Sequence, residues 1–379
     1  MIALQTTSLF DGSSFTGPTT VLVDDAGYVS AVVDAPPRGV ALAATPPGTT
    51  LSPGFVDLQV NGGGGVLFND AITVYGLRRI AAAHAALGTT SILATLITSP
   101  RPHIAAALEA VAAARAQAVP GILGVHIEGP FISPKRPGIH PPEFIATMTE
   151  DDAAMLSAPR DGVRLVTLAP EEVTPAHVAR LLDAGVRVFA GHTEATAEQA
   201  TAAFAQGVHG VTHLFNAMSQ FGSRTPGMVG ATLGDDAAAA GIIVDLLHVA
   251  RAAVRAAYRA LGPDRLFLVS DSMPTIGSDI DHFTLAGRVI RLVDGRLADA
   301  ADTLGGAQIC MAEAVRNAVA LCAIPVADAL RMATSTPARW AGVDHVGRIA
   351  PGYRADFVTL DAKLNVVGVW QGGVAVPMP

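Results

Sequence analysis

The sequence predicts an α/β fold: a TIM (β/α)8 barrel with a small β-sandwich domain formed by the N- and C-terminal segments. Short runs rich in Val, Ile and Leu alternate with alanine-rich runs through the middle of the chain. These apolar runs lack the alternating polar residues of a half-exposed sheet, which indicates parallel strands covered on both faces. Both ends of the chain instead contain short strand-like segments separated by turn residues.

Eight barrel strands and five helices are expected in the middle of the chain. The strands are expected at 54–60, 91–97, 122–127, 163–168, 186–190, 210–212, 241–244 and 266–269. The helices are expected at 74–87, 103–117, 175–184, 195–206 and 250–261, and all but the second are followed by a glycine, a common helix terminator. About eight strand–helix units over roughly 280 residues are what a TIM barrel requires. A doubly wound open sheet is the structural alternative.

The two ends of the chain are expected to build one domain together. Asp11-Gly12 and a Pro/Gly-rich stretch at 36–48 separate short strands near the N-terminus. Apolar strands at 356–360 and 366–370 flank polar turns near the C-terminus. We therefore expect residues 1–51 and 341–379 to form the β domain and residues 52–340 to form the barrel.

The composition narrows the class of protein. The 379 residues include 33 acidic and 25 basic side chains, for a formal net charge of −8, so nucleic acid and membrane surfaces are not expected as partners. Half of the residues are hydrophobic and 15% are charged, which excludes a disordered chain. The longest uncharged stretches, 80–100 and 199–223, contain polar residues and are not membrane spans.

The cysteines and the N-terminus bear on the cellular compartment. Cys310 and Cys322 suffice for neither a disulfide framework nor a thiolate metal site. The first residues show no basic segment followed by an apolar run, so no signal peptide is expected. We therefore expect a cytoplasmic protein with reduced cysteines.

Metal-competent side chains follow four of the predicted strands. They are Glu128, His192, His213 and Asp271. Because the carboxyl ends of parallel barrel strands face one mouth, we expect these residues to meet in space. By contrast, His84 lies within a predicted helix and is expected to face solvent.

One carboxylate and two imidazoles suit Zn²⁺ or Fe²⁺ and leave positions open for water and substrate. A bound divalent ion lowers the pKa of water and polarises a carbonyl. Asp271 is placed to take a proton from that water and pass it to a departing amine. No Gly-x-Ser-x-Gly motif is present, so we expect amide hydrolysis without a covalent intermediate.

Several motifs resemble the N-acetylglucosamine-6-phosphate deacetylase family of the amidohydrolase superfamily. The motifs specific to that family are EGP at 128–130 and THLFNAM at 212–218. Further matching segments are PGFVDLQVNG at 53–62, GVHIEGPF at 124–131, GIH at 138–140, GHT at 191–193, LHV at 247–249, VSD at 269–271 and GRIAPGYRADF at 347–357.

The resemblance implies a role for each matching residue. Glu128, His192 and His213 would bind one divalent metal ion per subunit, Zn²⁺ in the first place, with Fe²⁺, Mn²⁺ and Co²⁺ as alternatives. Asp271 would be the general base and then the acid, and His140 would stabilise the oxyanion. The amino-sugar phosphate would be bound by Gln59, Asn61, His140, Asn216, Ala217, Arg224 and His248. The family further implies a homodimer in which Arg224 and His248 reach across the interface.

The sequence also departs from the superfamily pattern. Gln59-Val60-Asn61 replaces the usual His-x-His, so one metal ion is expected rather than two. Leu246 and Thr225 replace an expected Gly and Glu near the sugar phosphate, which leaves the exact sugar open. The implied reaction is deacetylation of N-acetyl-D-glucosamine 6-phosphate. Another N-acetylhexosamine phosphate, such as the galactosamine epimer, and a non-catalytic scaffold are the alternatives.

Overall fold

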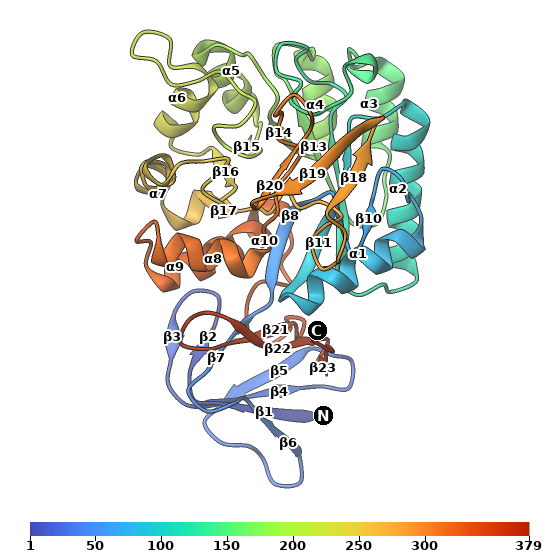
Figure 1. The fold of residues 1–379 in the computed structure, drawn as a ribbon. Helices are drawn as coiled ribbons and strands as arrows, with labels where there is room; N and C mark the ends of the chain where they lie inside the picture. Colours follow the sequence, from blue (N-terminus) through green and yellow to red (C-terminus); the bar gives the residue numbers. More distant parts are fainter. Residues whose placement is uncertain (379) are drawn as a thin grey trace.

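A parallel barrel forms the larger part of the molecule in this computed structural model, which describes residues 1–378 (Figure 1). Eight strands are hydrogen-bonded in the order β17-β16-β15-β14-β13-β12-β11-β8. They are β8 (Phe55–Val60), β11 (Thr89–Ile97), β12 (Ile122–Glu128), β13 (Val163–Leu168), β14 (Arg187–Ala190), β15 (Gly210–Val211), β16 (Ala239–Ile242) and β17 (Leu266–Leu268). The eight predicted strands are therefore all present, with ends shifted by at most two residues.

The segment after β17 closes the barrel against β8. Val60 and Ser272 form a parallel bridge, and the Asp271 amide donates to the Gln59 carbonyl at 3.0 Å. The barrel prediction is thereby confirmed and the open doubly wound sheet is excluded. Every residue of β8, β11 and β12 is buried, as expected for strands covered on both faces.

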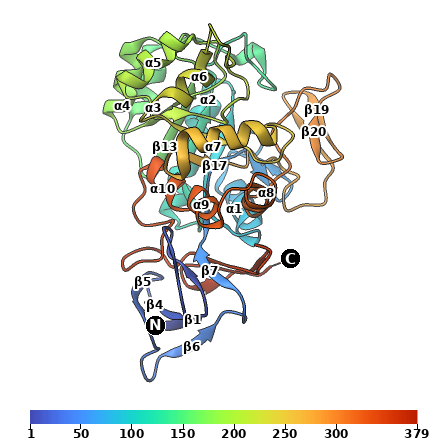
Figure 2. The same ribbon diagram turned by 90° about the vertical axis from the view of Figure 1, so that its left-hand side faces the viewer.

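Helices surround this barrel (Figures 1 and 2). They are α1 (Val74–Ala86), α2 (Arg101–Ala116), α3 (Glu150–Ser157), α4 (Pro175–Asp183), α5 (Ala197–Gln206), α6 (Gly227–Gly234), α7 (Arg251–Arg265), α8 (Met311–Ala320), α9 (Val326–Ala333) and α10 (Ser335–Ala341), with a 3₁₀ turn η1 (Pro142–Phe144). Threonine side chains cap the N-termini of α1, α3, α4 and α5. Gly262 has a φ of +66° within α7, so that helix is kinked at the glycine where the sequence predicts its end.

Two small sheets at the far end of the molecule combine both termini (Figure 2). One has the order β5-β4-β1-β6 and the other β23-β22-β21-β7-β2-β3. Their strands are β1 (Ile2–Thr6), β2 (Leu9–Phe10), β3 (Phe15–Thr16), β4 (Thr19–Val23), β5 (Val29–Val33), β6 (Ala41–Ala44), β7 (Thr50–Pro53), β21 (Phe357–Leu360), β22 (Val366–Gln371) and β23 (Val374–Ala375). Leu4 and Val21 of one sheet share a buried cluster with Leu51 and Phe357 of the other, as the sandwich prediction requires.

A three-stranded antiparallel sheet follows β17 and was not predicted. It consists of β18 (His282–Leu285), β19 (Arg288–Val293) and β20 (Arg296–Ala298), and it projects from the side of the barrel (Figure 2). Phe283 and Ile290 of this sheet pack in one cluster with Ile97, Ile139 and Met273. Since Ile97 ends β11, the sheet rests on the rim formed by the strand ends.

Two further short strands, β9 (Gly62–Gly63) and β10 (Val66–Leu67), form a hairpin beyond β8.

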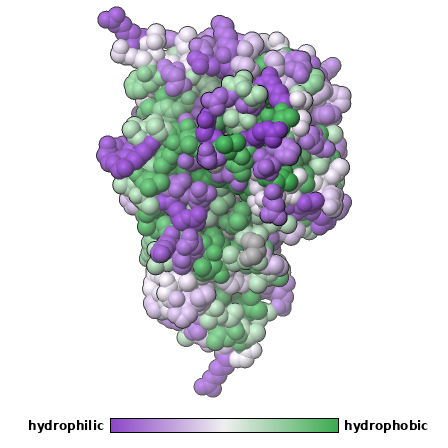
Figure 3. Space-filling view, viewed as in Figure 1, coloured by the Kyte–Doolittle hydropathy of each residue, from purple (hydrophilic) through white to green (hydrophobic). Residues whose placement is uncertain are grey.

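On the face drawn in Figure 3, hydrophilic and hydrophobic residues are interspersed over both parts of the molecule. Among the residues that the structure describes, no helix is both long and apolar enough to cross a membrane.

Candidate metal centre and substrate cavity

Three of the predicted metal ligands meet at the carboxyl ends of barrel strands. Glu128 is the last residue of β12, while His192 and His213 each lie two residues beyond a strand, β14 and β15. His213 Nε2 lies 3.0 Å from Glu128 Oε1 and 3.1 Å from His192 Nε2, and His192 Nε2 lies 3.5 Å from Glu128 Oε1. Ligands about 2.1 Å from a tetrahedral ion are about 3.4 Å apart, so these three atoms are spaced to bind one cation.

The backbone around these residues is unusual. His192, His213 and Asp271 have φ values of +48°, +34° and +51°, a left-handed conformation that costs a non-glycine residue on the order of 1–3 kcal/mol. Such strain is retained where surrounding contacts hold it, and it concentrates at functional sites. In His192, His213 and Asp271, a sharp backbone turn just after a strand therefore sets the direction of the side chain.

The hydrogen bonds of His192 prepare it to bind a cation. Its Nδ1 lies 2.9 Å from the Arg136 carbonyl oxygen, which can only accept, so Nδ1 carries the proton. The lone pair of a neutral His192 is then on Nε2, which faces Glu128. Burial alone would raise the pKa of Glu128, but the neighbouring imidazoles of His192, His213 and His140 outweigh burial and hold that pKa well below its usual value.

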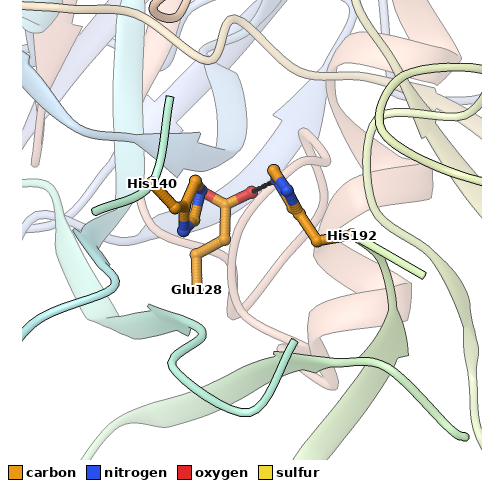
Figure 4. A group of neighbouring side chains, drawn as sticks. All are labelled: Glu128, His140 and His192. Carbon is orange, nitrogen blue, oxygen red and sulfur yellow. Dashed lines mark ion pairs between the residues drawn. The ribbon is translucent and has the colours of Figure 1, made fainter. Parts of the chain in front are cut away.

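His140 lies beside this group and not within its tightest part. Its Nε2 is 3.9 Å from Glu128 Oε2, and the potential ligand atoms of Glu128, His140 and His192 lie within 4.8 Å of one another (Figure 4). Its Nδ1 is 2.7 Å from the Thr98 hydroxyl, so the imidazole is held at that end and leaves Nε2 free beside Glu128. The shorter distances favour His213 over His140 as the third ligand.

Two buried amides hold the carboxylates of the site. Asn61 Nδ2 donates to Asp271 Oδ1 at 2.7 Å, and Gln59 Nε2 donates to Asp271 Oδ1 at 3.1 Å and to Glu128 Oε1 at 3.0 Å. Their NH₂ groups thus point at the place where a superfamily His-x-His would offer lone pairs. Burial, and then the charge of Glu128, raises the pKa of Asp271 to about 6.

A cavity of about 400 Å³ opens onto the metal-ligand group. This volume lies within the range that is typical of small-molecule sites. The cavity is lined by Ile97, Glu128, Lys135, Arg136, Pro137, Gly138, Ile139, His140, His192, His213, Asn216, Ala217, Ile243, His248, Asp271, Met273, Thr303, Leu304 and Gly306.

The predicted substrate residues lie in three different places. His140, Asn216, Ala217 and His248 line the cavity of their own chain, and His248 Nδ1 is held 2.6 Å from Asp245 Oδ2. Gln59 and Asn61 are buried behind it, with 1% and 0% exposure.

Arg224 is exposed in the loop before α6 and is not one of the lining residues. His248 therefore reaches the cavity without crossing to another subunit.

Sequence reasoning missed three residues around the site. Thr98 directly follows β11 and holds His140, Asp245 precedes His248 by three residues and holds its ring, and Lys135 lines the cavity. The position of Thr98 immediately beyond a strand is a signal that the sequence does carry. Nothing in the sequence identified Lys135 except that only two lysines are present.

The closed barrel and the carboxylate–histidine group at its mouth define a metal-dependent hydrolase of the TIM-barrel class. The amidohydrolase family matches residues 50–376, and the chain belongs to that family. The chain is 42% identical to an N-acetylgalactosamine-6-phosphate deacetylase of Shewanella sp. (strain ANA-3), with 86% of this chain and 82% of the relative covered. It is 38% identical to an N-acetylglucosamine-6-phosphate deacetylase of Haemophilus influenzae, with 86% of each covered.

Solved structures agree with these relatives. The N-acetylglucosamine-6-phosphate deacetylase of Pasteurella multocida matches with a TM-score of 0.94 and 34% identity over 99% of each chain. A variant of the Mycobacterium smegmatis enzyme, solved with N-acetyl-D-glucosamine-6-phosphate, matches with a TM-score of 0.90 and 33% identity over 99% of each chain. The resemblance inferred from the motifs is thereby confirmed.

Proposed function

We propose that this chain hydrolyses the acetamide of N-acetyl-D-glucosamine 6-phosphate to D-glucosamine 6-phosphate and acetate. The observation that carries the proposal is the convergence of Glu128, His192 and His213 beside Asp271, on a cavity sized for a small molecule. Relatives named as deacetylases of N-acetylhexosamine 6-phosphates share this fold over nearly the whole chain.

Glu128, His192 and His213 would hold one divalent cation. Their oxygen and two nitrogen donors suit Zn²⁺ first, and Fe²⁺, Mn²⁺ or Co²⁺ as alternatives. When bound, such a cation polarises the amide carbonyl and lowers the pKa of the attacking water. A second cation is not expected, because Gln59 and Asn61 present NH₂ groups where lone pairs would be needed.

Asp271 moves the proton. Asn61 and Gln59 occupy its Oδ1, so Oδ2 accepts the proton of the attacking water as the new carbon–oxygen bond forms. The same oxygen then returns the proton to the amide nitrogen, the carbon–nitrogen bond breaks, and acetate and the free amine leave.

His140 would stabilise the negative charge that develops on the carbonyl oxygen. The single Thr98 hydroxyl proton has two acceptors in reach, the Glu128 carbonyl oxygen at 3.4 Å and His140 Nδ1 at the shorter distance of 2.7 Å. When it is donated to Nδ1, the proton of a neutral imidazole is on Nε2. That nitrogen lies on the cavity side, near Glu128. A donor held in place before the reaction stabilises an oxyanion without a reorganisation cost.

Asn216, Ala217 and His248 would contact the sugar phosphate from within the chain, and Arg224 would reach the phosphate from a second subunit. This arrangement requires a homodimer, which sedimentation of the active protein tests. A monomer with full activity would remove Arg224 from the site. We propose a cytoplasmic location, where sugar phosphates are retained.

The galactosamine epimer is the second candidate, because the 42% identical relative carries that name. Acetate release from both N-acetylhexosamine 6-phosphates and from both unphosphorylated sugars, after loading with each metal, tests the proposal. Equal rates with and without the phosphate would contradict a sugar-phosphate substrate. A purified chain that binds no divalent metal and releases no acetate would instead indicate a scaffold.

A further inference from the structure

The charged groups that line the cavity are unequally neutralised. Glu128 and Asp271 supply negative charge, and Lys135, Arg136 and His248 supply the basic groups outside the metal-ligand group and its neighbour His140. The Arg136 guanidinium is paired with Glu194, and His248 is paired with Asp245. Within residues 1–378, no carboxylate oxygen lies within 4.0 Å of the Lys135 ammonium, and no hydrogen bond occupies it.

The loop that carries Lys135 is fixed on both sides of it. The Ser133 amide donates to the His192 carbonyl at 2.8 Å, and His192 Nδ1 donates to the Arg136 carbonyl at 2.9 Å. The Arg136 amide also donates to the Ser133 carbonyl at 3.0 Å, which closes a turn around Lys135. The backbone of Lys135 is thus held in place while its side chain is exposed at the cavity.

The same rim of the cavity carries the residues expected to meet the phosphate. The loop after His192 is joined to the next loop by a hydrogen bond from the Thr193 amide to the Ala217 carbonyl, 3.0 Å long. Thr193 and Met218 also form a parallel bridge. The turn with Lys135, the His192 loop and the Asn216–Ala217 loop therefore lie in sequence around one side of the mouth.

We propose that Lys135 binds the phosphate of the amino-sugar phosphate from within the same chain. This inference rests on the proposed function. A dianionic phosphate beside Glu128 and Asp271 requires compensating positive charge. Arg136 is paired with Glu194, whereas the Lys135 ammonium acts on Glu194 only from beyond salt-bridge distance. An ammonium offers three donors on a flexible stem and binds phosphate as a point charge.

The test compares Lys135→Met with Lys363→Met. Lys363 is the only other lysine and lies in the exposed turn between β21 and β22, so its substitution removes the same charge from elsewhere. For Lys135→Met, the ratio of kcat/KM for the phosphorylated sugar to that for the unphosphorylated sugar should fall about tenfold, mainly through KM. Lys135→Arg should restore most of the ratio, and Lys363→Met should not change it.

Calorimetric binding of the product D-glucosamine 6-phosphate separates this inference from the proposed reaction. About tenfold weaker binding to Lys135→Met supports the inference even if the wild-type chain released no acetate, which would contradict only the reaction. Unchanged binding by Lys135→Met overturns the inference. An equal loss for phosphorylated and unphosphorylated sugars also overturns it, because Lys135 would then merely support the loop.

Discussion

Substitution of Asp271 by Asn removes the proton acceptor and leaves its surroundings in place. Asn61 and Gln59 both donate to Oδ1, so the new side chain must turn its carbonyl oxygen toward them. Its NH₂ group then takes the position of Oδ2 and cannot accept a proton. Loss of a positioned general base lowers kcat by about 10²–10⁴-fold, which corresponds to about 3–5 kcal/mol of barrier.

The assay is acetate release at saturating sugar phosphate, together with metal content by elemental analysis. Asp271 lies outside the Glu128, His192 and His213 group, so the variant should keep its metal stoichiometry. Without metal, the Asp271→Asn variant should melt at no lower a temperature than the metal-free wild type. The reason is that burial, and then the charge of Glu128, disfavour the ionised Asp271 carboxyl. Asp279→Asn, at an exposed position eight residues on, is the matched control. Near-normal kcat, or loss of the metal, would refute the reasoning.

Three further predictions concern the metal, the subunit contact and stability. His192→Ala should weaken metal binding by more than about tenfold, measured by competition with a chelator, while the exposed His103→Ala should not. Equal metal content in both variants would remove His192 as a ligand. Arg224→Ala should raise KM for the phosphorylated sugar and leave KM for the unphosphorylated sugar little changed; equal KM values with and without the substitution would contradict a shared site. Asp152→Ala should lower the free energy of unfolding by about 2 kcal/mol, because it removes the carboxylate that accepts from the Thr149 amide in the capping box of α3 and that pairs with Arg101. Burial raises the pKa of Asp152, but hydrogen bonds from Arg101 and Thr149 outweigh burial and lower that pKa. In denaturant titrations, the difference in unfolding free energy between Asp152→Ala and the wild type should therefore persist above about pH 4 and vanish as the pH falls further. A difference that grew in acid would contradict this prediction.

The barrel could be predicted because its strands obey one simple physical rule. Parallel strands covered by helices are continuous apolar runs, and the strand predicted at 163–168 coincides with β13. The convergence of Glu128, His192, His213 and Asp271 followed from topology, since residues directly beyond such strands share one mouth, whereas the residues expected to bind substrate came from the family resemblance. What the sequence could not give is which atoms face each other, such as the amide of Gln59 between two carboxylates.

The sheet β18–β20 was missed although its turns are marked in the sequence. Ala286-Gly287 and Asp294-Gly295 all have positive φ values, from +47° to +78°, as two-residue hairpin turns require. The position of His84 was predicted wrongly, because it is fully buried and its Nε2 lies 2.9 Å from the Gly62 carbonyl oxygen. Its spacing of seven, four and three residues from Leu77, Ile80 and Ala81 places it on the buried face of α1.

The antiparallel pairing of β7 with β21 joins residues 50–53 to residues 357–360. During synthesis, the N-terminal strands therefore leave the ribosome some 300 residues before the partner that completes their sheet. Most of the residues of the large buried core belong to the intervening barrel, which is free to form first, as domains of nascent chains do. The edge of β7 that later pairs with β21 stays open throughout that interval. The nascent chain is therefore most prone to mispairing near its N-terminus, and its sheet is completed only by a strand near its C-terminus.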